Sequence, residues 1–312
     1  MKRALVVALN PAVDAEWRVG PIHWDEKNTI HSETRWAGGK GVNVARWLAH
    51  LGGSPRLLIT LGGASGAEVA MQLHAAHVST NIIRVSQPTR VNVMVTQPAG
   101  PQLRFNPPGP RLTRAEWRDV FTEAEQEHGR CALQLLSGAL PRDASPTVYR
   151  RLIQLARRSG VETVLDCDGP ALAAGVGARP FLVKPNEHEL SEWAGRPLRT
   201  DAAVRRAALA MSVKTGGWVL VSRAARGAML VNAGLPMVLV ALAPAVSVLN
   251  TVGAGDALVA AAALQRQLGA SPTEWLRWGV AAGTAAAQTR AGVLAPIALV
   301  ARTAWRVTVR EA

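Results

Sequence analysis

The feature that most constrains the fold of this chain is a regular alternation of short apolar runs with helix-length patterns. Strand-like runs occur at residues 4–9, 57–61 and 132–136, and apolar residues at helical spacing lie between them, as at 42–51. Parallel strands joined by helices produce this order, because each connection has to cross back over the sheet. The sequence therefore predicts an α/β fold with a central, mainly parallel sheet flanked by helices.

Two segments interrupt the alternation with strands alone. Residues 12–36 contain strand-like pieces without a helical pattern, and residues 88–106 have the alternating apolar residues of a hairpin that turns at 98–101. Strands inserted between α/β units favour a small β lid over the edge of the main sheet. No linker, repeat or low-complexity tract divides the sequence, so residues 1–312 are expected to form a single domain.

The composition disfavours several other classes of protein. No apolar run approaches the ~20 residues that span a bilayer, and the run at 4–9 ends at Asn10 without a signal-peptide cleavage site. The two cysteines, Cys131 and Cys167, cannot build a disulfide framework, which fits a reducing cytoplasm. The formal net charge is +13, but no basic run of five or more residues occurs. Solvated arginines, with some attraction of anionic substrates, therefore explain the charge better than nucleic-acid binding does.

The run Thr-Val-Gly-Ala-Gly-Asp at 251–256 predicts a phosphate site. A short strand around 246–248 is expected to lead into it, and helices at 254–268 and 272–289 are expected to follow and to close the chain. The glycines bring backbone N–H groups close to a ligand at the positive end of a helix. Asp256 would lie in the first helical turn, as a base for phosphoryl transfer to an alcohol. A plain glycine turn before a helix is the alternative, because such turns are common.

Two further polar motifs precede helices. Gly-Gly-Lys-Gly at 38–41 suits close approach of the backbone to a ligand, but Lys40 is followed by glycine, so the motif is not a Walker A loop. Lys-Pro-Asn at 184–186 ends a strand, and Asn186 and Glu189 have the spacing of a capping box. Their place at the carboxyl end of a strand also suits water or magnesium beside a nucleotide phosphate.

Together these motifs resemble those of PfkB-type sugar kinases of the ribokinase superfamily, in the branch of phosphofructokinases and tagatose-6-phosphate kinases. Residues 37–45 match the first signature of the family, residues 251–256 the second, and residues 184–186 with Glu189 its magnesium-nucleotide motif. Shorter stretches also match, at 9–14, 89–92, 105–106 and 137–141. The resemblance implies a ribokinase-like central sheet flanked by helices and covered by a β lid.

The resemblance also implies a role for each matching residue. Asp256 would take the proton from the attacking sugar hydroxyl, and the amides of Gly253, Ala254 and Gly255 would form an anion hole. Seven residues would bind the sugar or its phosphate: Asp14, Lys27, Gly39, Lys40, Asn43, Arg90 and Arg104. Six would line the nucleotide: Lys184, Asn186, Glu189, Ser222, Gly227 and Thr251. Of these, Asn186 and Glu189 would hold Mg2+ through water.

Two departures from the family pattern lie near the expected nucleotide. Ala224 stands where members usually have glycine, so a β-carbon there either crowds the nucleotide or requires a different backbone angle. Asn250 stands where Asp or Ser is commoner. Neither residue touches the expected base, so nucleotide affinity would be affected before activity.

The function that the resemblance implies is ATP-dependent phosphorylation of a hexose phosphate in the cytoplasm, with ATP, Mg2+ and a monovalent cation such as K+. Lys40 and Asn10 favour fructose 1-phosphate as the substrate, giving fructose 1,6-bisphosphate. A 6-phosphofructokinase and a tagatose-6-phosphate kinase stay open. A non-catalytic sugar-phosphate-binding regulator is more remote, because Asp256 is intact. We expect no membrane or nucleic-acid partner, and a homodimer through the lid.

Overall fold

The computed structural model of the chain describes residues 3–98 and 102–312. A ten-stranded sheet forms its centre, built from β1 (Arg3–Ala8), β4 (Pro55–Leu61), β5 (Ser79–Arg84), β8 (Cys131–Ser137), β9 (Glu162–Asp166), β10 (Leu182–Val183), β11 (Trp218–Ser222), β12 (Ala228–Asn232), β13 (Met237–Leu242) and β14 (Thr308–Glu311). The strand order is β14-β13-β12-β11-β10-β9-β8-β1-β4-β5. Neighbouring strands are parallel from β5 to β11 and antiparallel from β11 to β14. The predicted α/β class is confirmed.

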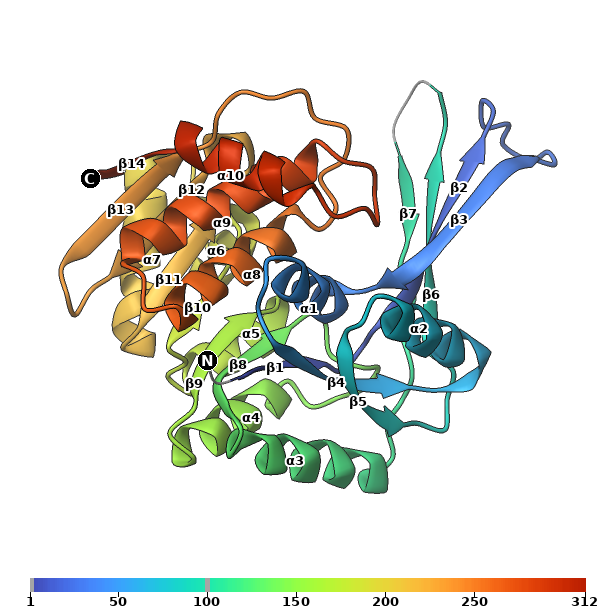
Figure 1. The fold of residues 1–312 in the computed structure, drawn as a ribbon, viewed down its shortest axis with the longest axis horizontal. Coiled ribbons are helices and arrows are strands. Elements are labelled where there is room, and N and C mark those ends of the chain that lie inside the picture. Colours follow the sequence, from blue (N-terminus) through green and yellow to red (C-terminus); the bar gives the residue numbers. More distant parts are fainter. Residues whose placement is uncertain (1–2, 99–101) are drawn as a thin grey trace.

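Helices cover both faces of this sheet (Figure 1). One face packs against α1 (Lys40–His50), α2 (Gly63–Ala75), α8 (Ala254–Gln267), α9 (Pro272–Ala287) and α10 (Ile297–Arg306). The other packs against α3 (Arg114–His128), α4 (Val148–Arg158), α5 (Gly169–Val176), α6 (Glu187–Ala194) and α7 (Asp201–Thr215). Successive β1 side chains alternate between the two cores, Val6 facing one and Val7 the other. Each such fully buried side chain stabilises the fold by roughly 1.5–3 kcal/mol.

A second sheet of four strands projects from the body, at the upper right of Figure 1. It contains β2 (Ala12–Val19), β3 (Ile30–Gly38), β6 (Arg90–Thr96) and β7 (Leu103–Phe105), in the order β3-β2-β6-β7. We call it the lid sheet. Its strands lie in the two segments where the sequence predicts strands without helices, although β3 continues to Gly38. Residues 99–101 of the expected hairpin turn lie outside the described residues.

Two local predictions are wrong. No strand forms at 246–248, because β13 has already ended at Leu242 and Pro244 cannot donate to a ladder. Instead the amides of Leu249 and Asn250 donate to the carbonyl of Ala287 at the end of α9.

The prediction that two helices end the chain is also wrong. Helix α10 follows them, and β14 then pairs antiparallel with β13. The pairing covers backbone N–H and C=O groups that β13 would otherwise leave at a bare sheet edge. Within the described ranges, no helix is both long and apolar enough to cross a bilayer.

Candidate active site

A cavity of about 1340 Å³ lies where the parallel strands end, beneath the lid sheet. Ser137 ends β8, Lys184 follows β10 and Ser222 ends β11, and all three line it. Adjacent parallel strands present their carboxyl ends at one edge of the sheet, which is where α/β proteins bind ligands. The strand order therefore brings together residues that are far apart in the sequence.

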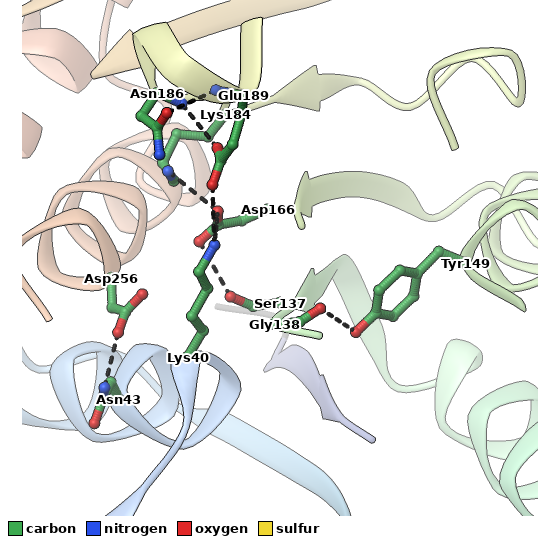
Figure 2. Close-up of polar contacts among 10 residues, drawn as sticks. All are labelled: Lys40, Asn43, Ser137, Gly138, Tyr149, Asp166, Lys184, Asn186, Glu189 and Asp256. Carbon is green, nitrogen blue, oxygen red and sulfur yellow. Dashed lines mark hydrogen bonds and ion pairs between the residues drawn. The ribbon is translucent and has the colours of Figure 1, made fainter. Parts of the chain in front are cut away.

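Asp256 lies in the first turn of α8, with only 5% of its surface exposed. Gly253 caps that helix with φ 80°, a left-handed conformation that favours glycine, and so turns the chain toward the cavity. The Asp256 carboxylate accepts a hydrogen bond from Nδ2 of Asn43 at 2.8 Å (Figure 2). Burial, and next the charge of Asp166, raise the pKa of Asp256 to about 6. A carboxylate with such a pKa accepts a proton efficiently near neutral pH.

Two lysines and a buried carboxylate form an ionic cluster beside Asp256 (Figure 2). Oδ1 of Asp166 lies 3.1 Å from Nζ of Lys184 and 3.5 Å from Nζ of Lys40, and its Oδ2 accepts a hydrogen bond from Ser137 at 3.2 Å. Burial opposes ionisation, but the two lysines lower the pKa of Asp166 below its usual value. Asp166 and then Glu189 hold the pKa of Lys40 well above its ordinary range. The cluster therefore stays charged, because each ionised side chain lies beside one of opposite charge.

Asn186 and Glu189 form the capping box that their spacing predicts. The side chain of Asn186 accepts from the amide of Glu189 at 2.8 Å, and Oε2 of Glu189 accepts from the amide of Asn186 at 2.9 Å. Oε1 of Glu189 points into the cavity, 3.4 Å from Nζ of Lys40. The cap thus fixes a carboxylate at the edge of the ionic cluster.

Asp14 and Arg90 both line the lid end of the cavity, where the charge of Arg90 acts on the carboxyl group of Asp14. Oδ1 of Asp14 accepts from Asn92 at 2.7 Å, and burial raises the pKa of Asp14. Gly38 leaves room for this carboxylate, because a β-carbon there would lie 2.0 Å from Oδ2. The guanidinium of Arg90 donates to the carbonyls of Pro107 and Asn10, at 2.9 and 3.0 Å.

The opposite end of the cavity is shaped by a loop and by an apolar helix. Gly227 and Thr251 line it, as does Ala224, whose φ of 51° is left-handed. Ala224 therefore has a backbone conformation that glycine adopts more readily than alanine does. Helix α9 adds four lining residues that the sequence patterns did not single out: Val280, Gly283, Thr284 and Ala287.

Comparisons with known proteins match this architecture. The family of pfkB carbohydrate kinases matches residues 10–297. The 1-phosphofructokinase of Rhodobacter capsulatus is 37% identical over 281 residues, which are 89% of this chain and 88% of that protein. The ATP-dependent 6-phosphofructokinase isozyme 2 of Escherichia coli is 35% identical over 291 residues, 92% and 93% of the two chains. Phosphofructokinase-2 of Escherichia coli, solved in complex with potassium, superposes with a TM-score of 0.92 at 31% identity, covering 98% and 99%.

This chain belongs to the pfkB family of carbohydrate kinases.

All but one of the residues that the resemblance to pfkB kinases suggested line the cavity beneath the lid sheet. The exception is Lys27, which is exposed in the connection between β2 and β3 and is not among the lining residues. That connection extends the lid sheet beyond the cavity, so the prediction that Lys27 contacts the substrate has no support within a single chain. Arg104 does line the cavity, although its guanidinium donates to the side chain of Gln102 at 2.8 Å.

Sequence patterns missed some residues of this pfkB-family site. Asp166 lies outside the motifs of the sequence analysis, although it ends β9 at the same sheet edge as Lys184 and contacts both cavity lysines. Its position at the end of a buried strand was the available signal. Asn92, which holds Asp14, lies in the matching stretch 89–92, whereas Arg223, which lines the cavity beside Ala224, carries no local signal.

Proposed function

We propose that this chain transfers the γ-phosphoryl group of ATP to a hydroxyl of a hexose phosphate in the cytoplasm. The preferred substrate is fructose 1-phosphate, and the product is fructose 1,6-bisphosphate. The observation that carries the proposal is the buried Asp256 carboxylate, held by Asn43 at the N-terminus of α8, beside backbone amides. A base next to an anion site is the arrangement that phosphoryl transfer to an alcohol requires.

The proposed reaction transfers the phosphoryl group in a single step. The sugar hydroxyl gives its proton to a carboxylate oxygen of Asp256, and its oxygen forms the new bond to the γ-phosphorus. The bond from that phosphorus to the bridging oxygen breaks, and ADP leaves with the electron pair. The amides of Gly253, Ala254 and Gly255, at the positive end of α8, stabilise the charge that develops on the phosphoryl oxygens. Asn43 orients the base through its hydrogen bond.

Mg2+ fits the polar groups at the start of α6. Among residues 3–98 and 102–312, no group of three or more His, Cys, Asp or Glu side chains could hold a metal ion by itself. Mg2+ usually keeps several waters and takes one or two carboxylates plus substrate phosphates, so this donor set is sufficient. Glu189 and Asn186 would hold it through water, and the ion would neutralise phosphate charge. A monovalent cation such as K+ completes the proposal, since the relative from Escherichia coli was solved with potassium.

The arginines at the lid end support a phosphorylated sugar. Arg90 lines the cavity with its guanidinium fixed by two carbonyls, and Arg104 lies on the adjacent lid strand β7. A guanidinium fork suits phosphate, so a free sugar would leave this charge unpaired. A phosphate on either end of a ketose could use the same groups. Relatives that are 1-phosphofructokinases and a 6-phosphofructokinase have similar identity, so fructose 6-phosphate and tagatose 6-phosphate are the alternatives.

One coupled assay of ADP release tests the proposal. We would compare fructose 1-phosphate, fructose 6-phosphate, tagatose 6-phosphate and fructose at equal concentrations. We expect fructose 1-phosphate to give the highest kcat/KM, and fructose to lie at least about 10²-fold lower, because unpaired donors lower transition-state binding. A comparable kcat/KM for fructose would contradict the role of the arginines. Sugar-phosphate binding without ADP release would favour a non-catalytic regulator.

We also propose a homodimer formed through the lid sheet. Ile30 on β3 and Phe105 on β7 are 42% and 57% exposed, and Trp24 in the connection between β2 and β3 is 76% exposed. Exposed large apolar side chains on the lid sheet and on its β2–β3 connection favour contact with a second surface. A second lid sheet is the simplest such surface, since an interface between identical patches closes by twofold symmetry.

A further inference from the structure

The loop between β11 and β12 carries a compact set of charges that the proposed reaction does not use. Arg223 begins the loop and its side chain is only 3% exposed, although the loop lies at the rim of the cavity. Arg226 lies one turn further on and is 56% exposed. Ala224 and Gly227 of the same loop line the cavity. A buried arginine requires charged partners, and this one has two.

Glu187 and Asp201 are the partners of both arginines. Nε of Arg223 lies 2.8 Å from Oε1 of Glu187, and its Nη2 contacts Oδ1 of Asp201. Arg226 donates from Nη1 to Oδ1 of Asp201 at 3.1 Å and from Nη2 to Oε2 of Glu187. We call these four side chains the arginine clamp.

The carboxylates of the arginine clamp come from two different helices. Glu187 is the first residue of α6, directly after the cap formed by Asn186, and Asp201 is the first residue of α7. Carboxylates at these positions are favoured by the helix dipoles, so they are well placed whether or not the arginines are present. The clamp therefore ties the loop to the N-termini of two helices.

The loop that the clamp holds has an unfavourable backbone. Ala224 has φ 51°, a left-handed conformation that glycine adopts readily and alanine does not. Gly227 has φ 84°, and a β-carbon there would lie 2.0 Å from the carbonyl oxygen of Ala241. Within the loop, the amide of Arg223 donates to Gly227 at 2.9 Å and the amide of Gly227 donates to Ala224 at 3.0 Å. These bonds depend on the left-handed angle at Ala224 being kept.

We propose that Arg223 is a positioning residue for nucleotide binding. Through its contacts with Glu187 and Asp201, Arg223 holds the loop 223–227 in the conformation in which Ala224 is left-handed. Without these contacts, the loop would relax to a conformation that alanine prefers. The inference rests on the proposed function, because it assigns this end of the cavity to ATP. It adds that the clamp compensates for the alanine that replaces a glycine at this position.

The test measures nucleotide binding directly and kinetics separately. For Arg223→Gln we expect the Kd of a fluorescent ATP analogue and the KM for ATP to rise roughly tenfold, as for loss of a coupled buried contact. The KM for the sugar phosphate and kcat at saturating ATP should change less than about twofold. Arg266→Gln is the matched control, because it removes a 2.7 Å ion pair to Glu162 at the far end of α8. It should leave ATP binding unchanged.

Rescue separates positioning from a general loss of structure. Adding Ala224→Gly to Arg223→Gln should restore most of the ATP affinity, because glycine holds the left-handed angle without help. If ATP affinity is unchanged in Arg223→Gln, or is lost and not restored by Ala224→Gly, the proposal is overturned. Should Arg223→Gln fail to fold, Asp201→Ala, which removes a 69% exposed partner of both arginines and leaves Arg223 paired with Glu187, gives the same comparison.

The outcome also separates this inference from the proposed function. If the wild-type protein binds the ATP analogue but phosphorylates none of the sugar phosphates, the proposed reaction fails while the binding series still decides the role of Arg223. If the wild-type protein binds no nucleotide, both proposals fail.

Discussion

At the scale of single residues, the site depends on how burial and charge set the state of Asp256. The carboxylate is buried, lies near the negative Asp166 and is balanced by Asn43 and by two lysines. Removing water raises the energy of the charged form, while the lysines keep it within reach at neutral pH.

Asp256→Asn should lower kcat by roughly 10²–10⁴-fold, the usual effect of losing a positioned base. The amide of asparagine can still accept the hydrogen bond from Asn43, so the far-UV circular dichroism spectrum should not change. Steady-state ADP release checks the first expectation. Near wild-type turnover in this variant would contradict the assignment of the base.

The pH dependence should follow the raised pKa of Asp256. In the wild-type protein kcat/KM should fall about tenfold per pH unit below about pH 6, because the protonated base cannot accept the hydroxyl proton.

The same shift predicts a stability effect of the opposite sign. The pKa is raised from 3.8, so the stabilisation from the protonated form is fully present below about pH 4 and is lost as the pH rises through about 6. Asp256→Asn should therefore be more stable than the wild-type protein at pH 8, by roughly 1–3 kcal/mol, and equally stable below pH 4. Urea denaturation at the two pH values measures the difference.

At the scale of secondary-structure elements, the site is assembled where two sheets meet. The lid strands β2 and β6 contribute Asp14, Asn92 and Arg90, while the N-termini of α1, α6 and α8 contribute the groups beneath them. Helix N-termini suit the anionic part of a substrate, and lid strands suit groups that close over it. Substitutions on the lid strands should therefore affect the binding of the sugar phosphate, and substitutions at the nucleotide end of the cavity should affect the binding of ATP.

Arg90→Ala should weaken sugar-phosphate binding by about 1.5–3 kcal/mol, the value of a charge-assisted contact. The KM for ATP should change little, because Arg90 lies on the lid strand β6, away from the loop 223–227. Arg104→Ala is the comparison, and its effect should be smaller, since that guanidinium is exposed and donates to Gln102. A larger change in the KM for ATP than in that for sugar phosphate would place Arg90 in the other half of the site.

Ala224→Gly by itself should stabilise the protein, because a left-handed alanine costs about 1–2 kcal/mol, partly offset by the greater unfolded-state entropy of glycine. We expect a net gain of roughly 0.5–1 kcal/mol in urea denaturation. The KM for ATP should improve by less than about twofold, because the arginine clamp already holds the loop. Loss of stability would show that the loop has adapted around the methyl group.

At the scale of the whole molecule, two hydrophobic cores enclose the main sheet, and one of them extends into the base of the lid sheet through Val13 of β2 and Ala37 of β3. The buried clusters on the two faces are built mainly from the ten central strands and the helices that cover them. The lid sheet has one long, exposed outer strand, β3. The lid sheet is therefore anchored at its base, where β2 and β3 join the core, while most of β3 is exposed.

Sedimentation equilibrium should give a mass about twice 33.0 kDa for the wild-type protein. Ile30→Glu with Phe105→Glu should shift this mass to that of the monomer, because two buried charges would oppose an apolar interface. Trp305→Glu is the control, since Trp305 is 88% exposed on α10, away from the lid sheet. A wild-type monomer at all concentrations would contradict the proposed dimer.

Much of the fold and of the site follows from short-range patterns. The parallel sheet is visible in the alternation of apolar runs, and the cap at Asn186 and Glu189 depends on residues only three positions apart. Helices α3 and α7 are not among the expected elements, although apolar residues at helical spacing lie in both, at 117, 120, 121 and 124 and at 204, 207, 208 and 211. The strand expected at 246–248 shows the converse error, since a short apolar run does not by itself find a partner strand.

The sequence by itself determined the glycine turns, the helix that carries Asp256 in its first turn and the capping box of Asn186 and Glu189, because these depend on neighbours within one or two helical turns. Only the tertiary structure decided that Asp166 joins Lys40 to Lys184, that Arg223 reaches two helices and that Lys27 lies away from the cavity. The strand order decides which distant residues meet. Burial then sets their charges, because the energy of an ion depends on which groups have replaced water around it.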